Sequence, residues 1–421
     1  MAGSPYVALP VMGPDGARLV PAPEKLAEFF EPRRVFVDIV GQGGAGKTRL
    51  ALQICHWLAG GRLLAHPAAA VLIDEEFDDV SAVIEGKLKA ALGTDAPTAQ
   101  FLSVLLARGR LWIVIDRVSE RQPSTRAAVT RIYKSVSPKV VICTSRLPVP
   151  IEGGPKISLV PEPLDRDTLE YFVLLQLHTS DALRLFPDRG QLVRFINEMA
   201  PQVAGRAGVP RVTPLLVTIV VTQAIESARA HGTAALRNLP RNVPEIYFSY
   251  VQRLDETRQD QPAAPGVARG TLIRVAASII AYVELGEDFR PKRVDDAKVN
   301  AALMADQRIE ASQIDFIDRF EQNGLLSRRT VGTHSTVEYL LDPLAECLAA
   351  HVHARACGES RERWDALLRK VAERGEGAQG FMAALRMNHE AYAQELGFPQ
   401  TVFPALAEDV PPAPMVRETA G

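Results

Sequence analysis

The sequence has few cysteines, no long hydrophobic run and no strong excess of either charge. Its four cysteines are scattered without CxxC or Cys/His ligand spacing, which argues against a disulfide framework or a zinc site. Its most apolar run, residues 214–221, is far shorter than the ~20 residues that a membrane span requires. The N-terminus lacks a basic stretch followed by an apolar core, so we expect a cytoplasmic protein that does not bind membranes.

The balance of charge gives no reason to expect nucleic acid as a main partner. The 48 lysines and arginines nearly match the 50 aspartates and glutamates, for a formal net charge of −2. Binding to a polyanion would therefore need a local basic patch. A hydrophobic share of 47% is typical of folded globular proteins. At roughly 100–200 residues per domain, the length suggests about two to four domains.

The first part of the chain predicts an α/β domain. Residues 1–30 are rich in proline and glycine and predict an irregular leader laid against that domain. From residue 31 to residue 160, continuous apolar runs alternate with segments of helical spacing, a pattern typical of a parallel sheet with helices on both faces. The runs that we expect to form strands are residues 35–40, 68–74, 110–116 and 139–146.

The rest of the chain predicts mainly helices. Residues 161–241 contain amphipathic segments, such as 191–200, and predict a small helical domain. Residues 242–355 predict a winged-helix domain, because helices are followed there by two short strands joined by a polar turn. Residues 356–421 predict a helical segment that ends in a loose, proline-rich tail.

Residues 41–48 carry the strongest functional signal in the sequence. They read GQGGAGKT and match the phosphate-binding pattern GxxxxGK[ST] between an expected strand and an expected helix. Glycines let successive backbone N–H groups turn toward phosphate oxygens, and the helix N-terminus adds the positive end of its dipole. A simple glycine-rich turn is the alternative, but such a turn needs neither Lys47 nor Thr48. The residues expected to bind the nucleotide are Gly41, Gly43, Gly44, Ala45, Gly46, Lys47, Thr48 and Arg49.

The expected ligand is ATP or ADP with Mg²⁺. Lys47 should contact the β- and γ-phosphates, and Thr48 should bind Mg²⁺, which takes only one or two ligands from protein. Asp116 ends the most hydrophobic strand and is the candidate second magnesium ligand. Glu120 is the candidate for orienting or activating the attacking water. The alternatives are a helix N-cap for Asp116 and a solvated loop charge for Glu120.

Polar residues also follow the other expected strands. Thr144, Ser145 and Arg146 close one strand, where a hydroxyl and a guanidinium would sense a γ-phosphate. The alternatives are capping by Thr144 or Ser145 and a surface ion pair for Arg146. Residues 74–76 are three consecutive acids at another strand end, and we interpret them as rim charges without a partner.

Five segments together resemble the NACHT branch of the STAND signal-transduction ATPases. In chain order they are GQGGAGKT, LWIVIDRVSE, VVICTSR, RVTPLLVTIV and YLLDPLAECLAAHV. The resemblance covers residues 35–355 and implies a nucleotide-binding domain, a helical domain and a winged helix. It also implies a switch that is closed with ADP and oligomeric with ATP. Within it, Asp116 is the Walker B acid, Arg146 is the first sensor and Pro214 contacts the adenine.

Two departures from the family pattern bear on the expected activity. Ser119 stands where an aspartate is common, which implies slow or assembly-dependent ATP hydrolysis. Asp342 stands near the place of a winged-helix histidine that often contacts the β-phosphate of ADP. His334 is a second candidate for that contact, and a surface-turn histidine is its alternative interpretation.

The sequence therefore favours a nucleotide-gated switch that forms a homo-oligomer when activated. The effector and sensor segments of such switches are not evident in it, and its composition suggests a GC-rich bacterial source, in which the family commonly serves antiphage defence. One alternative is a P-loop enzyme, such as a small-molecule kinase, that turns over as a monomer. Another is a winged-helix DNA-binding regulator, which the absence of a basic stripe in residues 242–353 disfavours.

Overall fold

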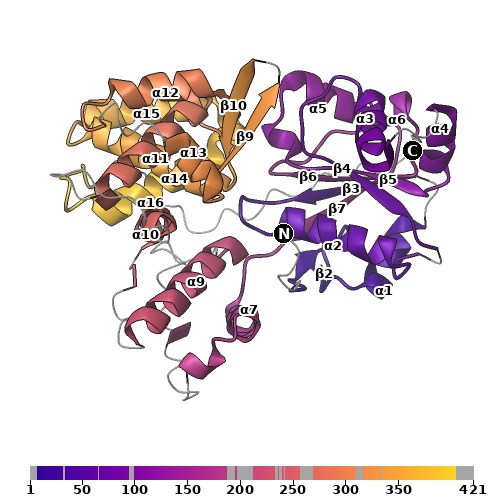
Figure 1. The fold of residues 1–421 in the computed structure, drawn as a ribbon, viewed down its shortest axis with the longest axis horizontal. Helices are drawn as coiled ribbons and strands as arrows, with labels where there is room; N and C mark the ends of the chain where they lie inside the picture. The colour runs from indigo at the N-terminus through magenta and orange to yellow at the C-terminus, as the bar shows by residue number, and fades with distance from the viewer. Residues whose placement is uncertain are drawn as a thin grey trace.

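The structure, a computed structural model, contains a parallel sheet covered by helices and a second body built mainly of helices (Figure 1). The sheet body is drawn in indigo and purple, and the helices of the second part run from magenta (α7) to yellow (α16). The described residues are 7–31, 34–64, 66–93, 99–186, 195–196, 212–232, 236, 239–240, 242–256, 269–309, 316–331 and 333–403. The predicted α/β fold with a parallel sheet is confirmed. No helix in these ranges is long and apolar enough to span a bilayer.

The main sheet has the strand order β2-β1-β7-β3-β6-β5-β4, in which β3 to β7 run parallel. The parallel strands are β3 (Val35–Val40), β4 (Ala69–Ile73), β5 (Leu111–Ile115), β6 (Val140–Ser145) and β7 (Lys156–Pro161). All four predicted strands are present, each within one residue of its predicted bounds. The fifth, β7, was not predicted, because buried and exposed side chains are mixed along it. Its position beside β3 places the phosphate-loop strand in the interior of the sheet, away from its edges.

The expectation of an irregular leader is wrong in part. Residues of the leader form β1 (Val11–Met12) and β2 (Arg18–Leu19), and β1 pairs antiparallel with β7. A helical stretch follows, made of α1 (Pro23–Leu26) and a 3-10 turn (Ala27–Phe30). The ring of Phe30 lies 4.6 Å from that of Trp112, measured between centroids. The leader thus extends the sheet and contributes to its core.

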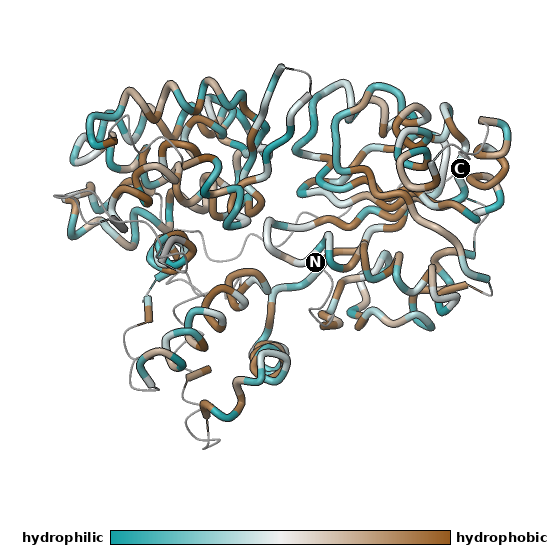
Figure 2. The backbone as a smooth tube through the Cα atoms, viewed as in Figure 1, coloured by the Kyte–Doolittle hydropathy of each residue, from teal (hydrophilic) through white to brown (hydrophobic). Residues whose placement is uncertain are grey.

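Helices cover both faces of the parallel sheet. The central strands are mostly hydrophobic in Figure 2, and alternate residues of β3 join two separate clusters of buried side chains. On one face lies α2 (Lys47–Ala59). The other face is covered by α3 (Val80–Leu92), α4 (Ala99–Ala107), α5 (Pro123–Thr130) and α6 (Ile132–Ser135). Burial on both faces explains why the strands are continuous apolar runs.

The second part of the chain begins with α7 (Arg166–Thr179) and α9 (Pro214–His231), followed by α10 (Val243–Glu256) and α11 (Arg269–Leu285). Next come α12 (Asp296–Ala305), α13 (Phe316–Gln322) and an antiparallel sheet of order β8-β10-β9. Its strands are β8 (Val294–Asp295), β9 (Leu326–Val331) and β10 (His334–Tyr339), and the last helices are α14 (Asp342–Cys357), α15 (Arg361–Glu373) and α16 (Gln379–Tyr392). The two predicted strands are present, while β8 was not predicted.

One continuous cluster of buried side chains joins all of these helices, from Leu164 to Val402. The expected boundary between residues 355 and 356 falls inside the last turn of α14, which packs against α11 and α16. Of the predicted helix at residues 191–200 only residues 195–196 are described, and the proline-rich tail after residue 403 lies outside the described residues. The proposed winged helix stays a prediction.

Candidate nucleotide site

The phosphate loop connects β3 to α2 in the way that its motif requires. Gly44 and Gly46 have φ angles of 77° and 89°, in the left-handed region that glycine adopts without strain. Helix α2 begins at Lys47, so its first-turn N–H groups have no acceptor within the helix. Residues 41–49 are partly buried, except Gln42 and Arg49, which are exposed. The loop therefore combines backbone donors with a helix N-terminus, which fits a phosphate group.

Lys47 lies over the loop that precedes it. Its Nζ donates hydrogen bonds of 2.8 Å to the carbonyl oxygens of Gly41 and Gln42. Burial lowers the pKa of Lys47, and the carboxylates of Glu120 and Asp342 oppose that effect. A phosphate beside this ammonium would supply the counter-charge that burial makes favourable. The position and chemistry of Lys47 fit the predicted phosphate contact.

Thr48 and Asp116 meet, although they are far apart in the sequence. The Thr48 hydroxyl donates a 2.8 Å hydrogen bond to Oδ1 of Asp116, and the Thr144 hydroxyl donates to the same oxygen. The backbone N–H of Arg117 donates to the Thr144 oxygen at 2.9 Å. Asp116 does not cap a helix, because the N-cap of the 3-10 turn Val118–Glu120 is Arg117. The N-cap alternative for Asp116 is therefore wrong.

The Thr48 hydroxyl and the Asp116 carboxylate fit a magnesium ion that keeps most of its waters. Within the described ranges, no group of three or more His, Cys, Asp or Glu side chains is arranged to hold a metal ion. A metal with a fully protein-built cage is therefore not indicated there. Thr48 and Asp116 would hold Mg²⁺ at the edge of the loop, and the ion would neutralise charge on the phosphates.

Arg146 is surrounded by three carboxylates. Its Nε donates a 2.9 Å hydrogen bond to Glu120, and its Nη2 lies 3.2 Å from an oxygen of Asp342. Its Nη1 donates to Glu346, which comes from α14, 200 residues away in the sequence. Burial acts to lower the pKa of Arg146, but the three carboxylates together outweigh it and raise that pKa. The Arg146 side chain is only 14% exposed, so the predicted alternative of a surface ion pair is wrong.

Glu120 is also enclosed. Its side chain is 14% exposed, which rules out a solvated loop charge. Burial, followed by the nearby Asp342 carboxylate, raises the pKa of Glu120 to about 8. Ser119, beside it, accepts a 2.9 Å hydrogen bond from the backbone N–H of Arg146. A carboxyl group with a pKa near neutrality can accept or release a proton, as general acid–base chemistry requires.

Two helix N-termini from the second part of the chain contact the loop. A Cβ atom on Gly43 would lie 2.8 Å from Cγ of Pro343, at the start of α14. The carbonyl of Gly44 accepts a hydrogen bond of 3.3 Å from the N–H of Leu215, in the first turn of α9. Pro214 is buried beside that contact. The loop is thus held between α9 and α14, while adenine binding by Pro214 stays a prediction.

The remaining candidates have mostly structural contacts. The acids at residues 74–76 are not without partners, because Asp74 pairs with Lys87 and Glu75 with Arg329, while Glu76 accepts from Thr125. The hydroxyl of Ser145 donates to the carbonyl of Leu147. The exposed His334 starts β10, which agrees with its interpretation as a surface histidine. Arg49 is exposed, and Ala45 donates its N–H to the carbonyl of Gln42 within the loop.

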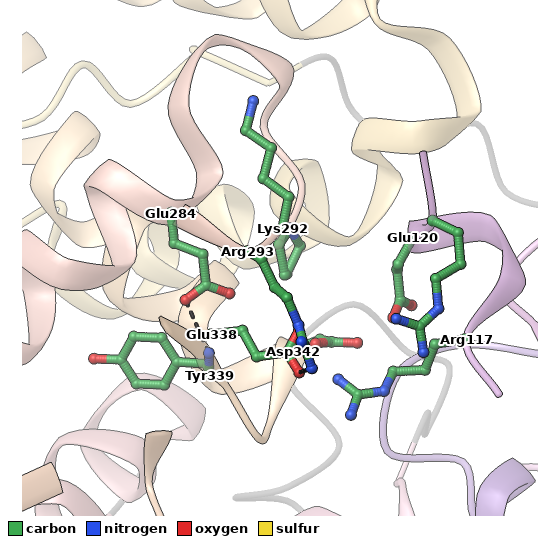
Figure 3. Close-up of a pocket in the computed structure, with 10 residues that line it drawn as sticks. Arg117, Glu120, Glu284, Lys292, Arg293, Glu338, Tyr339 and Asp342 are labelled. Atoms are coloured by element: carbon green, nitrogen blue, oxygen red, sulfur yellow. Dashed lines mark hydrogen bonds and ion pairs between the residues drawn. The ribbon is translucent and has the colours of Figure 1, made fainter. Parts of the chain in front are cut away.

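A small cavity lies beside the site, between the two parts of the chain (Figure 3). Arg117 and Glu120 line it from the sheet body, and Tyr339 and Asp342 line it from the helical body. Its volume of about 20 Å³ has room for about one water molecule, so it is not the nucleotide site. The nucleotide would lie on the partly exposed loop itself.

Sequence reasoning missed Glu346. This residue is 4% exposed and lies among buried apolar residues of α14. The available signal was an acid on the apolar face of a helix, where a charge needs a partner. The identity of the partner, Arg146, follows only from the fold.

Comparisons with known proteins found distant structural similarity and no sequence match. No protein-family model matches the chain, and no curated protein sequence matches it. One similar solved structure is the Aeropyrum pernix ORC1 protein in complex with DNA, at 14% identity, with a TM-score of 0.32, covering 77% of this chain and 89% of that chain. Another is a STAND protein with a tetratricopeptide repeat sensor from Pyrococcus horikoshii, at 13% identity, with a TM-score of 0.38, covering 94% of this chain and 50% of that chain. A third is RuvB of Thermotoga maritima, at 11% identity, with a TM-score of 0.29, covering 73% of this chain and 86% of that chain.

TM-scores this low carry no argument about the fold or the activity. The chain has a P-loop NTPase fold because its first parallel strand leads through GxxxxGK[ST] into a helix, inside a sheet with helices on both faces.

Proposed function

We propose that this chain is an ATP- and ADP-binding switch of the STAND type. The observation that carries the proposal is the position of the phosphate loop, which touches α9 through Gly44 and α14 through Gly43. A ligand can shift a conformational equilibrium only through contacts that differ between two states. Because the loop contacts both helices, phosphates bound there would change contacts with the second part of the chain.

In this proposal, the loop amides and Lys47 bind the phosphates, and Thr48 and Asp116 hold Mg²⁺. Arg146 senses the γ-phosphate, because its Nη2 lies beside the loop. This atom is 3.5 Å from the position that a Cβ atom on Gly43 would take. Glu120 orients or activates water for slow hydrolysis. The arrangement supports a state with α9 and α14 closed on the loop and a second state in which they move away.

The domain roles belong to the same proposal. Residues 161–241 form the helical region that contacts the loop through α9, and residues 242–355 form the winged helix that contacts it through α14. Opening exposes surfaces through which copies of the chain assemble into a homo-oligomer. A part in bacterial antiphage defence rests on the family resemblance.

The experiment compares the parent chain with Lys47→Ala by size-exclusion chromatography and electron microscopy. We expect the parent to form a larger assembly with Mg²⁺ and a slowly hydrolysed ATP analogue than with ADP. We expect Lys47→Ala to give one size under both conditions, because it lacks the ammonium that binds the phosphates. Equal assembly of parent and variant with the ATP analogue would refute the switch. Substrate-stimulated turnover by a monomer would support the kinase alternative instead.

A further inference from the structure

We propose that Asp342 and Glu346 of α14 are positioning residues that pair with Arg146 and so occupy the guanidinium, which would otherwise bind a γ-phosphate. ATP then has to displace these carboxylates, whereas ADP, which has no γ-phosphate, does not. The inference rests on the proposed function and adds to it a device that sets the preference between the two nucleotides.

The first observation is the set of partners around Arg146. Each of its three guanidinium nitrogens faces a different carboxylate, from Glu120, Asp342 or Glu346. Two of these acids come from α14 and only Glu120 comes from the sheet body. The buried Nη2 has no hydrogen-bond acceptor with good geometry among the described residues, although Asp342 lies 3.2 Å away. This donor beside the loop therefore has the Asp342 carboxylate as its neighbour, which a phosphate oxygen would have to displace.

The second observation is the close packing of Glu346 against α16. A Cβ atom on Gly380, in the first turn of α16, would lie 2.2 Å and 2.5 Å from the two carboxylate oxygens of Glu346. A side chain at residue 380 would have to displace this carboxylate from its position. The absence of a side chain at residue 380 thus lets Glu346 reach Arg146.

The third observation concerns charge. Besides Arg146, the carboxylates face Lys47, and the Asp342 carboxylate also acts on Glu120. Asp342 and Glu346 already lie against two of the three guanidinium nitrogens. A γ-phosphate at the same guanidinium would repel them, because like charges at short range in a partly buried site are weakly screened. Binding of ATP therefore competes with the contact between α14 and Arg146.

The experiment measures the dissociation constants of ADP and a slowly hydrolysed ATP analogue, both with Mg²⁺, for parent and Glu346→Gln. We expect Glu346→Gln to shift the preference toward the ATP analogue roughly tenfold, which is the effect of one hydrogen bond to a charged group. Arg146 keeps two carboxylate partners in this variant, so the guanidinium is not left unpaired. Asp342→Asn provides a second variant at a more exposed position, where the side chain is 12% exposed.

Gly380→Ala tests the same contact without changing any charge. The added methyl group would displace the Glu346 carboxylate, so we expect a shift in the same direction as in Glu346→Gln. Gly86→Ala is the matched control, because Gly86 also lies in a helix and its added methyl would meet no atom within 4 Å. Glu75→Gln is the control for charge, since Glu75 also links the two parts of the chain but pairs with Arg329. Neither control should change the ratio of the two constants.

The combination with Arg146→Ala gives the decisive result. In that background Glu346→Gln should leave the ratio unchanged, because the two residues act through one contact. An unchanged ratio in both Glu346→Gln and Gly380→Ala, with nucleotide binding intact, would overturn this inference and leave the proposed switch standing. Failure of the parent to bind either nucleotide would overturn the proposed function itself.

Discussion

The two sides of the phosphate loop are built in different ways. On the sheet side, Thr48, Asp116 and Thr144 form short hydrogen bonds between the ends of neighbouring strands and the start of α2. On the helical side, Arg146 and Gly43 contact α14, which belongs to a separate cluster of buried side chains. The sheet side belongs to the core of the sheet body, whereas the helical side is an interface.

This difference separates binding from regulation. The sheet-side contacts hold residues in place whether or not the second part of the chain is docked. The helical-side contacts exist only when α14 lies on the loop. We therefore expect substitutions on the sheet side to abolish nucleotide binding. Substitutions on the helical side should instead alter how bound nucleotide affects the docking of α14.

The largest effect should come from breaking the sheet side with Asp116→Ala. The Thr48 and Thr144 hydroxyls would lose their acceptor, at a cost of about 1–3 kcal/mol for the buried Thr144 hydroxyl. The magnesium-dependent part of nucleotide affinity should also be lost. Chemical denaturation and calorimetric titration with and without Mg²⁺ measure the two effects. Stability and magnesium dependence equal to those of the parent would contradict the role of Asp116.

The sheet side could be predicted from the sequence because its signals are local. The strand β5 and the loop were recognised from a continuous apolar run and from the spacing of glycines before Lys47. The pairing of Thr48 with Asp116 then follows, because the carboxyl ends of parallel strands meet at one edge of a sheet.

The helical side could not be predicted in the same way. Glu346 is 200 residues from Arg146, and nothing in its own helix identifies the partner. The strand β7 was missed because its exposed positions break the apolar run. Likewise, no sequence signal linked Gly380 to a carboxylate, since a glycine shows only that a side chain is absent. Contacts between distant segments depend on the tertiary arrangement.

A sharper test of the helical side is Gly43→Ala. Its methyl group would lie 2.8 Å from the ring of Pro343, which is too close for an unstrained contact. Overpacking of this kind costs about 1–3 kcal/mol, and here it should loosen α14 from the loop. Hydrogen exchange should rise in residues 342–357 and stay unchanged in β5 and β6. Equal protection of α14 in the parent and the variant would argue against the interface.

The free energy of unfolding should also depend on pH through Glu120, which lies where the sheet side meets α14. Because the pKa of Glu120 is raised from 4.5 to about 8, the folded protein keeps a proton that the unfolded chain releases. The free energy of unfolding should therefore fall as the pH rises through this window, by at most about 1.4 kcal/mol per pH unit. Denaturation at pH 6, 7 and 8 measures the slope.

Glu120→Gln serves as the control for this slope, because its side chain does not titrate. The Glu120 carboxylate also acts to raise the pKa of Lys47, so the difference between the two proteins reports Glu120 together with its effect on Lys47. Identical slopes in the parent and the variant would show that Glu120 is not held protonated at the interface.

The smallest effect should come from Glu75→Gln, which breaks the 2.6 Å ion pair with Arg329 between the two parts of the chain. The Arg329 side chain is 40% exposed, so solvent screens the pair. We expect a loss of about 0.2–1 kcal/mol, measured by denaturation at low salt, and a smaller loss at high salt. A loss larger than that of Gly43→Ala would mean that the main contact between the two parts of the chain lies at Arg329 of β9 and not at the phosphate loop.

The most direct test of the central claim is the nucleotide content of the purified chain. Denaturing the protein and separating the released small molecules by ion-exchange chromatography should give an adenine nucleotide, mainly ADP, from the parent and none from Lys47→Ala. A parent chain that releases no nucleotide, and that also fails to bind added ATP or ADP with Mg²⁺, would contradict the assignment of the loop.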